Sequence, residues 1–170
     1  MEGKSPLIAV DTNVLIDLAD DHHVVWDAID TVKKRIPRAD LVATSTVIEE
    51  LAIAADDDSK PETKRLALLA LQSFIKWGVR PLDFTPVGHG INQRVADRIR
   101  QGGLLPDEEV NDSYVIAEAA LAECRLIITS DGHILEIDVT KLGAVLAKCD
   151  VATPLIVSPH KIAKDFFPKK

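Results

Sequence analysis

The 170-residue sequence predicts an α/β domain with a mainly parallel central sheet. Short apolar runs of strand length alternate with longer segments in which apolar residues recur at helical spacing, and this alternation is typical of parallel strands joined by helices. The length fits one domain. No internal repeat, low-complexity tract or linker divides residues 1–170. We therefore expect one domain whose sheet has about five strands.

The first strand and helix are predicted near the N-terminus. Leu7–Asp11 is short and apolar and is followed by Thr12, which predicts a buried strand. Helical spacing begins at Val14, and Asp11, Thr12 or Asn13 can cap that helix.

The next three elements are a helix, a strand and a second helix. Val24–Ile36 has apolar residues at helical spacing and basic residues at its C-terminal end, which suit the helix dipole. Leu41–Thr44 predicts the second strand. Ser45 or Thr46 can cap the following helix at Val47–Ala55.

A polar loop is expected at residues 56–61, before a helix whose apolar stripe runs through residues 66–77. Gly78 is expected to end this helix. Val79–Phe84 predicts a third strand at the edge of the sheet, because Pro81 lacks the N–H that a central strand needs.

The second half of the chain continues the alternation. Ile91–Arg100 predicts a helix, and Asp112–Glu123 predicts another that is apolar nearly all round and hence buried. Leu126–Thr129 predicts the fourth strand. The remaining predicted elements are a helix at Lys141–Lys148, a short strand at Leu155–Val157 and a terminal helix at His160–Phe167.

Composition and charge indicate an ordinary globular protein and argue against several other classes. The chain is 46% hydrophobic and 28% charged, as in ordinary globular domains, and its net charge is −7. That charge argues against a non-specific nucleic-acid coat, since phosphate binding depends on Lys and Arg. No apolar run reaches the roughly 18 residues of a membrane span, and the N-terminus lacks a signal-peptide core, so we expect a cytoplasmic protein. Cys124 and Cys149 are expected to be reduced, with no zinc site.

Four carboxylates stand where apolar segments end or helical patterns begin. Asp11 and Asp131 follow the first and fourth strands, whereas Glu50 and Asp112 lie at or near the starts of helices. In an open parallel sheet these positions share one edge, where ligands bind. Each acid taken alone could be a helix cap or part of a solvated helix face. Together they would repel one another without a cation among them, and hard oxygen ligands suit Mg²⁺ or Mn²⁺.

The order and spacing of these acids resemble the PIN-domain nucleases. The segment at residues 10–16, VDTNVLI, is similar to the opening motif of that family. The segment at residues 45–51, STVIEEL, resembles its second acidic motif, in which the Glu precedes a Leu. Residues 112–123 and the run ending at Asp131 resemble its third and fourth acidic motifs. The resemblance covers residues 7–138, and the ordered set of four motifs is more specific than the first alone.

This resemblance implies a Rossmann-like three-layer α/β/α sandwich that hydrolyses RNA phosphodiester bonds with Mg²⁺ or Mn²⁺. The implied catalytic residues, which we call the four acids, are Asp11, Glu50, Asp112 and Asp131. Asp11, Asp112 and Asp131 would be the metal ligands. The implied supporting residues, which would orient the acids or a water, are Thr12, Asn13, Thr129 and Ser130. Glu49 is adjacent to Glu50 and stays an alternative to it.

Members of the VapC type are toxins that a cognate antitoxin inhibits, so the resemblance implies an antitoxin partner. It also implies a homodimer. The chain departs from compact toxin members in its longer segment between the second and third motifs. This difference argues against the toxin role more than against the nuclease chemistry. Basic residues that could contact RNA phosphates are grouped at 33–38, 60–65 and 94–100. The amino-acid sequence does not indicate which RNA is cleaved, and DNA stays an alternative substrate.

Other classes fit the residues less well. A haloacid-dehalogenase-type phosphatase needs a second Asp two residues after the first, where this chain has Asn13, and a P-loop enzyme needs a GxxxxGK[ST] run that is absent. The alternative from another class is a catalytically silent PIN-like scaffold that binds RNA or a protein partner. Acidic residues at all four positions favour the enzyme over the scaffold.

Overall fold

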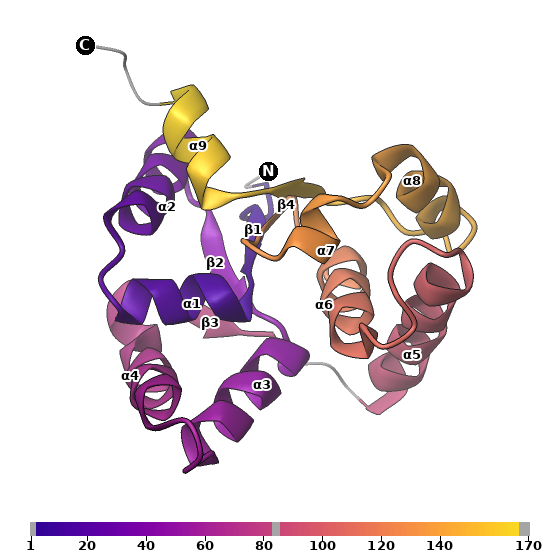
Figure 1. Ribbon diagram of the computed structural model, residues 1–170. Coiled ribbons are helices and arrows are strands. Elements are labelled where there is room, and N and C mark those ends of the chain that lie inside the picture. The colour runs from indigo at the N-terminus through magenta and orange to yellow at the C-terminus, as the bar shows by residue number, and fades with distance from the viewer. Residues whose placement is uncertain (1–2, 83–85, 167–170) are drawn as a thin grey trace.

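The computed structural model describes residues 3–82 and 86–166, with the side chains of 86–89 excepted. A central sheet is covered by helices on both faces, which gives three layers, α/β/α (Figure 1). All strand pairs are parallel, and the order across the sheet is β3-β2-β1-β4-β5. The predicted α/β sandwich with a parallel sheet is therefore confirmed.

The strands are short, and all of them end at the same edge of the sheet because they run parallel. Their bounds are β1 Leu7–Val10, β2 Asp40–Ala43, β3 Val79–Pro81, β4 Leu126–Ile128 and β5 Leu155–Val157. β1 pairs with β2 on one side and with β4 on the other. The chain thus builds one half of the sheet outward from β1 and then returns to build the other half. The edge beyond the carboxyl ends of β1 and β4 lies at this reversal, where open α/β sheets bind ligands.

One face of the sheet is covered by the helices on the left of Figure 1. Their bounds are α1 Thr12–Ala19, α2 His23–Arg35, α3 Ser45–Asp56, α4 Pro61–Trp77 and α9 Pro159–Phe166. The other face is covered by α5 Pro86–Gln101, α6 Val110–Leu121, α7 Gly132–Leu135 and α8 Val139–Ala147.

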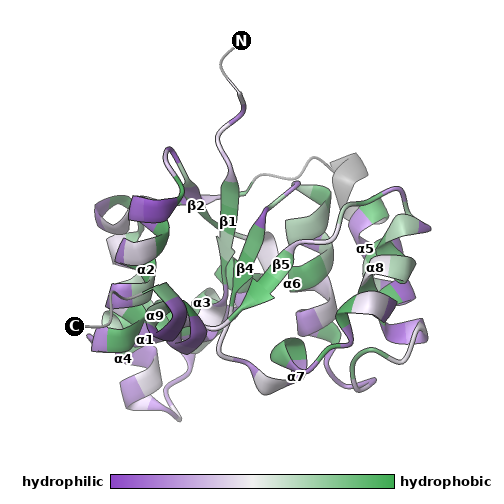
Figure 2. Ribbon diagram, turned by 90° about the horizontal axis from the view of Figure 1, so that it is seen from above, coloured by the Kyte–Doolittle hydropathy of each residue, from purple (hydrophilic) through white to green (hydrophobic). Residues whose placement is uncertain are grey.

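Alternating strand residues supply two separate hydrophobic cores. Ile8 and Val10 of β1 belong to the core beneath α1 to α4, whereas Ala9 between them belongs to the core beneath α5, α6 and α8. In β4, Ile128 belongs to the first core and Ile127 to the second. A strand buried on both faces must be apolar at every position, which explains why these strands are continuous apolar runs (Figure 2).

Several predicted boundaries are confirmed. β5 has the predicted bounds, and β3 is an edge strand as its proline indicated. Gly78 ends α4 with a φ of 71°, a left-handed conformation that glycine adopts without a Cβ clash. The predicted strand end at Phe84 and helix end at Phe167 lie outside the described residues.

Three local predictions are wrong. α3 is capped by Thr44, whose hydroxyl accepts from the Val47 N–H, and not by Ser45 or Thr46. α6 begins at Val110, so Asp112 lies in its first turn instead of opening it. The short helix α7 was not predicted, because four residues are too few for a helical period to be visible.

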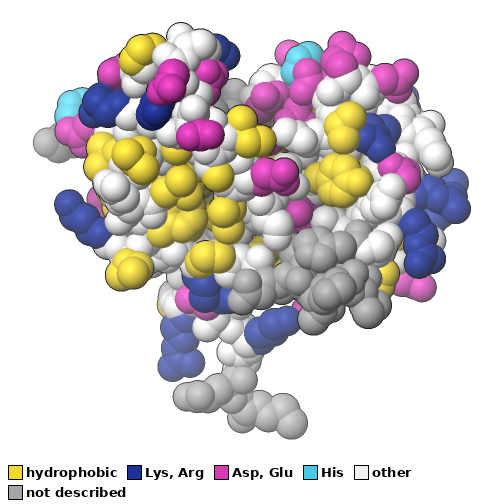
Figure 3. All heavy atoms as spheres, turned by 90° about the horizontal axis from the view of Figure 1, so that it is seen from below, with side chains coloured by type: hydrophobic (Ala, Val, Ile, Leu, Met, Phe, Trp, Pro, Cys, Tyr) yellow, Lys and Arg dark blue, Asp and Glu magenta, His cyan; other side chains and the backbone are white. Residues whose placement is uncertain are grey.

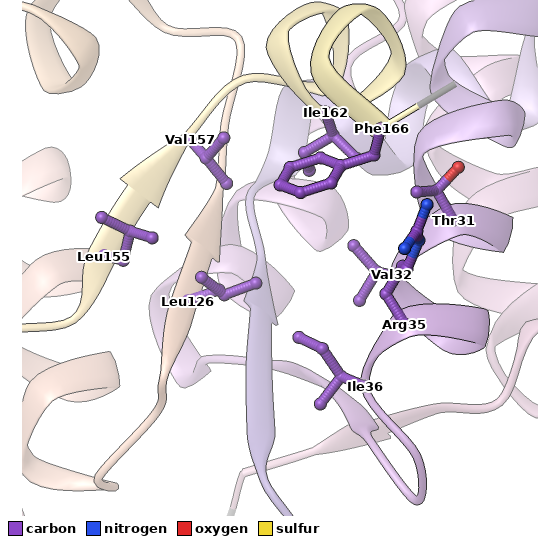
Figure 4. Close-up of a pocket in the computed structure, with 9 residues that line it drawn as sticks. All are labelled: Thr31, Val32, Arg35, Ile36, Leu126, Leu155, Val157, Ile162 and Phe166. Atoms are coloured by element: carbon purple, nitrogen blue, oxygen red, sulfur yellow. The ribbon is translucent and has the colours of Figure 1, made fainter. Parts of the chain in front are cut away.

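Two apolar surfaces lie away from the carboxyl edge of the sheet. A groove of about 260 Å³ lies between α2, α9 and the edge of the sheet, and its walls include Ile36, Val157 and Phe166 (Figure 4). Hydrophobic side chains also gather on the face shown in Figure 3, on the side where Figure 1 places α3 and α4. Leu68 and Ile75 of α4 are exposed, Ile75 almost fully. Among the described residues, no helix is long and apolar enough to cross a membrane.

Candidate functional site

Asp11 lies at the reversal point of the sheet and is held by three elements. It follows β1 directly and caps α1, where its Oδ1 accepts from the Thr12 N–H at 2.8 Å. Its Oδ2 accepts from the Thr129 hydroxyl at 2.7 Å. The residue is only 5% exposed, and burial raises the pKa of its carboxyl while these two hydrogen bonds oppose the rise. The carboxylate is therefore fixed in position.

Glu50 reaches the same region from α3. Its Oε2 accepts from the Thr12 hydroxyl at 2.6 Å, so Thr12 links the glutamate to the helix that Asp11 caps. Burial is the main cause that raises the pKa of Glu50, and the charges of Asp11 and Asp131 also raise it. Glu49 is exposed and lines a separate polar cavity. Of the two adjacent glutamates, Glu50 is the one that contacts Thr12.

The segment after β4 brings a further acid to this edge. Asp131 caps α7, with its Oδ1 accepting from the His133 N–H at 2.8 Å. Its own N–H donates to the Thr129 hydroxyl oxygen at 3.0 Å. The preceding Ser130 N–H donates to the Asn13 side-chain oxygen at 3.2 Å, which joins this segment to α1.

Asp112 lies in an electrostatically unfavourable environment. Its Oδ2 is buried and has no hydrogen-bond partner within the described part of the chain. Burial is the largest cause that raises the pKa of this carboxyl, and with the charges of Asp131, Asp11, Glu109 and Glu50, in decreasing order, it brings the pKa to about 7. A buried carboxylate without a partner is costly, and a cation would offset that cost.

The structure thus brings together the four acids and the supporting residues from α1, α3, α6 and the segment after β4. Within the described ranges, no Lys or Arg forms an ion pair with any of the four acids. Figure 3 shows acidic side chains on both sides of the hollow between the half with α3 and α4 and the half with α5 and α6. The edge is therefore an uncompensated concentration of negative charge.

The side chains do not form a closed ligand cage. Among the residues that the structure describes, no three Asp, Glu, His or Cys side chains stand close enough to hold one ion together. The charges of Asp131, Asp11 and Glu50 nevertheless raise the pKa of Asp112, so these carboxyls lie within electrostatic reach of it. Mg²⁺ keeps several of its waters and is held through one or two carboxylates, so a closed cage is not required. The orphaned Oδ2 of Asp112 and the all-oxygen donor set fit such a hydrated cation.

Two further residues near this edge were not predicted from the sequence. The Asn111 side chain opposes the rise in the pKa of Glu50, and Glu109 both raises the pKa of Asp112 and lies 3.5 Å from His133, measured from Oε1 to Nε2. Both residues precede Asp112 in the sequence. The signal that could have found them is the helix start at Val110, which places its first turn at the sheet edge.

Several basic residues expected to contact RNA are engaged in local pairs. Lys64 pairs with Asp58, and Arg100 pairs with Asp97. Lys33 donates to the Trp77 carbonyl oxygen at 3.0 Å. These three side chains already have partners within the protein. We therefore do not propose that they bind an RNA phosphate.

Comparisons with known proteins agree with this geometry. The PIN domain family model matches residues 8–139, most of the chain. No curated protein matches the sequence.

Solved structures share the fold at low sequence identity. A VapBC2 structure from Rickettsia felis, bound to a promoter DNA fragment, has a TM-score of 0.59 and 14% identity, covering 89% of this chain and 98% of that one. VapBC-1 from nontypeable Haemophilus influenzae gives 0.53 and 15%, covering 90% and 98%. FitAcB from Neisseria gonorrhoeae gives 0.53 and 19%, covering 89% and 97%.

Proposed function

Because the chain belongs to the PIN domain family, we propose that it is a Mg²⁺- or Mn²⁺-dependent endoribonuclease formed by residues 1–170 as one domain. The observation that carries the proposal is the buried Asp112 Oδ2, which has no partner among the described residues and lies within the electrostatic reach of four other acids. Such an arrangement is unfavourable in the free protein. It becomes favourable when a divalent cation binds.

The four acids have different roles in this proposal. Asp11, Asp112 and Asp131 would hold the cation, in part through its bound waters, and Glu50 completes the acidic edge. Thr12 fixes Glu50 through its hydroxyl, and Thr129 fixes Asp11. Asn13 and Ser130 tie the segment that carries Asp131 to α1. Ligands whose orientation is fixed by second partners bind a metal more tightly and more selectively.

When bound, the cation would neutralise phosphate charge and make a water more acidic, which is the chemistry that phosphodiester hydrolysis needs. The protein's part is to place carboxylates around the phosphate and to accept the proton that the attacking water loses. Glu50 is suited to that proton transfer, because its pKa is raised and its second oxygen is not used by Thr12.

The test is cleavage of a mixed pool of structured and single-stranded RNAs. Wild type and Asp11→Asn are compared with Mg²⁺, with Mn²⁺ and with EDTA. We expect cleavage by wild type with either metal, none with EDTA, and a loss of at least about 100-fold in the variant. A matched DNA pool distinguishes RNA from DNA as substrate.

Equal cleavage by wild type and Asp11→Asn would assign the activity to a contaminant or to another site. No cleavage with any metal, together with RNA or protein binding, would support the catalytically silent scaffold instead. The two results are separable because a contaminant's activity survives the substitution, whereas a scaffold has no activity to lose.

We further propose that a cognate antitoxin inhibits the enzyme and that the chain forms a homodimer in the cytoplasm. The observation that favours a partner is that the structural neighbours are VapBC and FitAB structures. Expression of wild type should arrest growth, and expression of Asp11→Asn should not. Growth arrest by both proteins would contradict a toxin that acts through this site.

A further inference from the structure

A buried carboxylate that the acidic edge does not use, Glu118, lies in α6, the helix whose first turn carries Asp112. Glu118 is only 2% exposed, and burial raises the pKa of its carboxyl. Within the described ranges, no Lys or Arg forms an ion pair with it. Such a group is costly to bury unless its oxygens are hydrogen-bonded, so its hydrogen-bond partner indicates its role.

The partner of Glu118 is the first turn of α3. Its Oε2 accepts from the Thr46 N–H at 3.3 Å, across 72 positions of the chain. Thr46 is the second residue of α3, where backbone N–H groups have no partner within the helix. The next N–H, that of Val47, donates to the Thr44 hydroxyl at 3.4 Å. A carboxylate also complements the positive end of the helix dipole, so Glu118 is a cap that α6 supplies to α3.

This contact joins elements that cover opposite faces of the sheet. α3 covers one face, whereas α5 and α6 cover the other (Figure 1). The polar cavity that Glu49 lines lies between these three helices, and its walls include Asn92 of α5 and Glu118. The side chains of Thr46, Thr44 and Asn92 lower the pKa of Glu118, which opposes the effect of burial and favours the charged form. Polar groups from both sides of the sheet therefore surround this one carboxylate.

Two of the four acids lie on the helices that the contact joins. Glu50 follows Thr46 by four residues in α3, so the two residues are about one turn apart on the same side of the helix. Asp112 precedes Glu118 by six residues in α6. The Thr12 hydroxyl fixes the end of the Glu50 side chain, whereas the cap at Thr46 fixes the backbone of the helix that carries it. A displacement of α3 would therefore move Glu50 relative to Asp112.

We propose that Glu118 is a positioning residue, which holds the start of α3 against α6 and thereby sets the distance between Glu50 and Asp112 for metal binding. The inference rests on the proposed metal-dependent function. Glu118 acts through Glu50, so its loss should have no further effect on metal affinity once Glu50 has lost its charge. A cap that only stabilised the fold would leave the metal affinity unchanged, or would lower it by the same factor in both cases.

The contact itself can be tested without metal. Hydrogen exchange of the Thr46 amide is measured in EDTA for wild type, Glu118→Gln and Glu118→Met. We expect slow exchange in wild type and in Glu118→Gln, whose amide oxygen still accepts from this N–H. In Glu118→Met, which lacks such an acceptor, exchange should be at least about ten-fold faster. Equal exchange at Thr46 in all three proteins would overturn the proposal. If Glu118→Met unfolds, Glu118→Leu serves in its place.

The effect on the acidic edge is measured by Mn²⁺ titration in a double-mutant cycle with Glu50→Gln. We expect Glu118→Met to weaken Mn²⁺ binding about ten-fold when Glu50 is present, and Glu118→Gln to stay within about two-fold of wild type. In the Glu50→Gln background, Glu118→Met should cause no further loss.

Unchanged Mn²⁺ affinity in Glu118→Met, or equal losses in the two backgrounds, would overturn the positioning role while wild type still binds metal and cleaves RNA. A wild type that neither binds Mn²⁺ nor cleaves RNA would contradict the ribonuclease proposal. That result would overturn the positioning role as well and leave Glu118 as a cap of α3, which the exchange at Thr46 measures independently.

Discussion

The Thr129 hydroxyl donates to Asp11 Oδ2 at 2.7 Å, across 118 positions of the chain. The same hydroxyl oxygen accepts from the Asp131 N–H, so one fully buried side chain sets the positions of two of the four acids. Because Thr129 directly follows β4 and Asp11 directly follows β1, the pairing of these strands determines the contact. The site depends on the register of the sheet.

Thr129→Val tests this dependence. The change keeps the side-chain volume but removes the donor to Asp11 and the acceptor for Asp131. We expect cleavage to fall about 10- to 100-fold and the free energy of unfolding to fall by about 1–3 kcal/mol. Thr129→Ser retains the hydroxyl and should stay close to wild type in both measurements. A fully active Thr129→Val would mean that Asp11 needs no such support.

Substitutions of the two adjacent glutamates should differ in their effect on metal binding. Glu50 contacts Thr12 at the acidic edge, whereas Glu49 lines the neighbouring cavity. We expect Glu50→Gln to reduce the rise in melting temperature that Mn²⁺ produces, because one negative charge is lost beside the ion. Glu49→Gln should keep that rise. The opposite pattern would move the site glutamate to position 49.

The parallel sheet could be predicted from the sequence because its strands are apolar on both faces and alternate with helical patterns. The ends of elements were harder to predict, since a cap is chosen by backbone geometry among several suitable residues. Thr44, Ser45 and Thr46 all have the chemistry of a cap, and only Thr44 has the extended backbone that places its oxygen over the helix start.

The positions of Asp11 and Asp131 follow from strand order, so sequence patterns could indicate their proximity. The contact between Thr12 and Glu50 could not be derived in that way, because it depends on how α3 turns beside α1. The cavity around Asn92 gave no sequence signal at all. Its residues come from three helices and have no periodicity in common.

Thr44 should contribute more to stability than its neighbour. Its hydroxyl accepts from the Val47 N–H at 3.4 Å, and its side chain also lowers the pKa of the buried Glu118, which favours the charged form of that carboxyl. Thr44→Val should lower the free energy of unfolding by about 1–2 kcal/mol, measured by urea denaturation, because the helix cap is lost and a buried carboxylate loses a partner. Ser45→Ala should change it by less than about 0.5 kcal/mol. Equal effects would contradict the cap seen at Thr44.

Stability in EDTA should fall as the pH rises. The pKa of Asp112 is raised from 3.8 to about 7, so between these values the folded protein binds more protons than the unfolded chain. The free energy of unfolding therefore decreases with pH across this window and levels off above about pH 7. We expect a loss of at least about 1 kcal/mol, after allowance for solvent screening, in melts from about pH 5 to about pH 8. Asp112→Asn, which cannot ionise, should flatten the curve, and a flat wild-type curve would contradict the raised pKa.

A divalent cation should restore the stability that wild type loses as the pH rises. At about pH 8 the Asp112 carboxylate is ionised and repelled by the other acids, so Mn²⁺ binding removes a penalty that the free protein carries. At a concentration about 100-fold above the dissociation constant, binding should stabilise the fold by roughly 3 kcal/mol. The gain should be smaller at about pH 5, where the proton competes with the ion. Asp112→Asn should start from a higher melting temperature without metal and gain less from it. A gain that is equal in both proteins would place the ion away from Asp112.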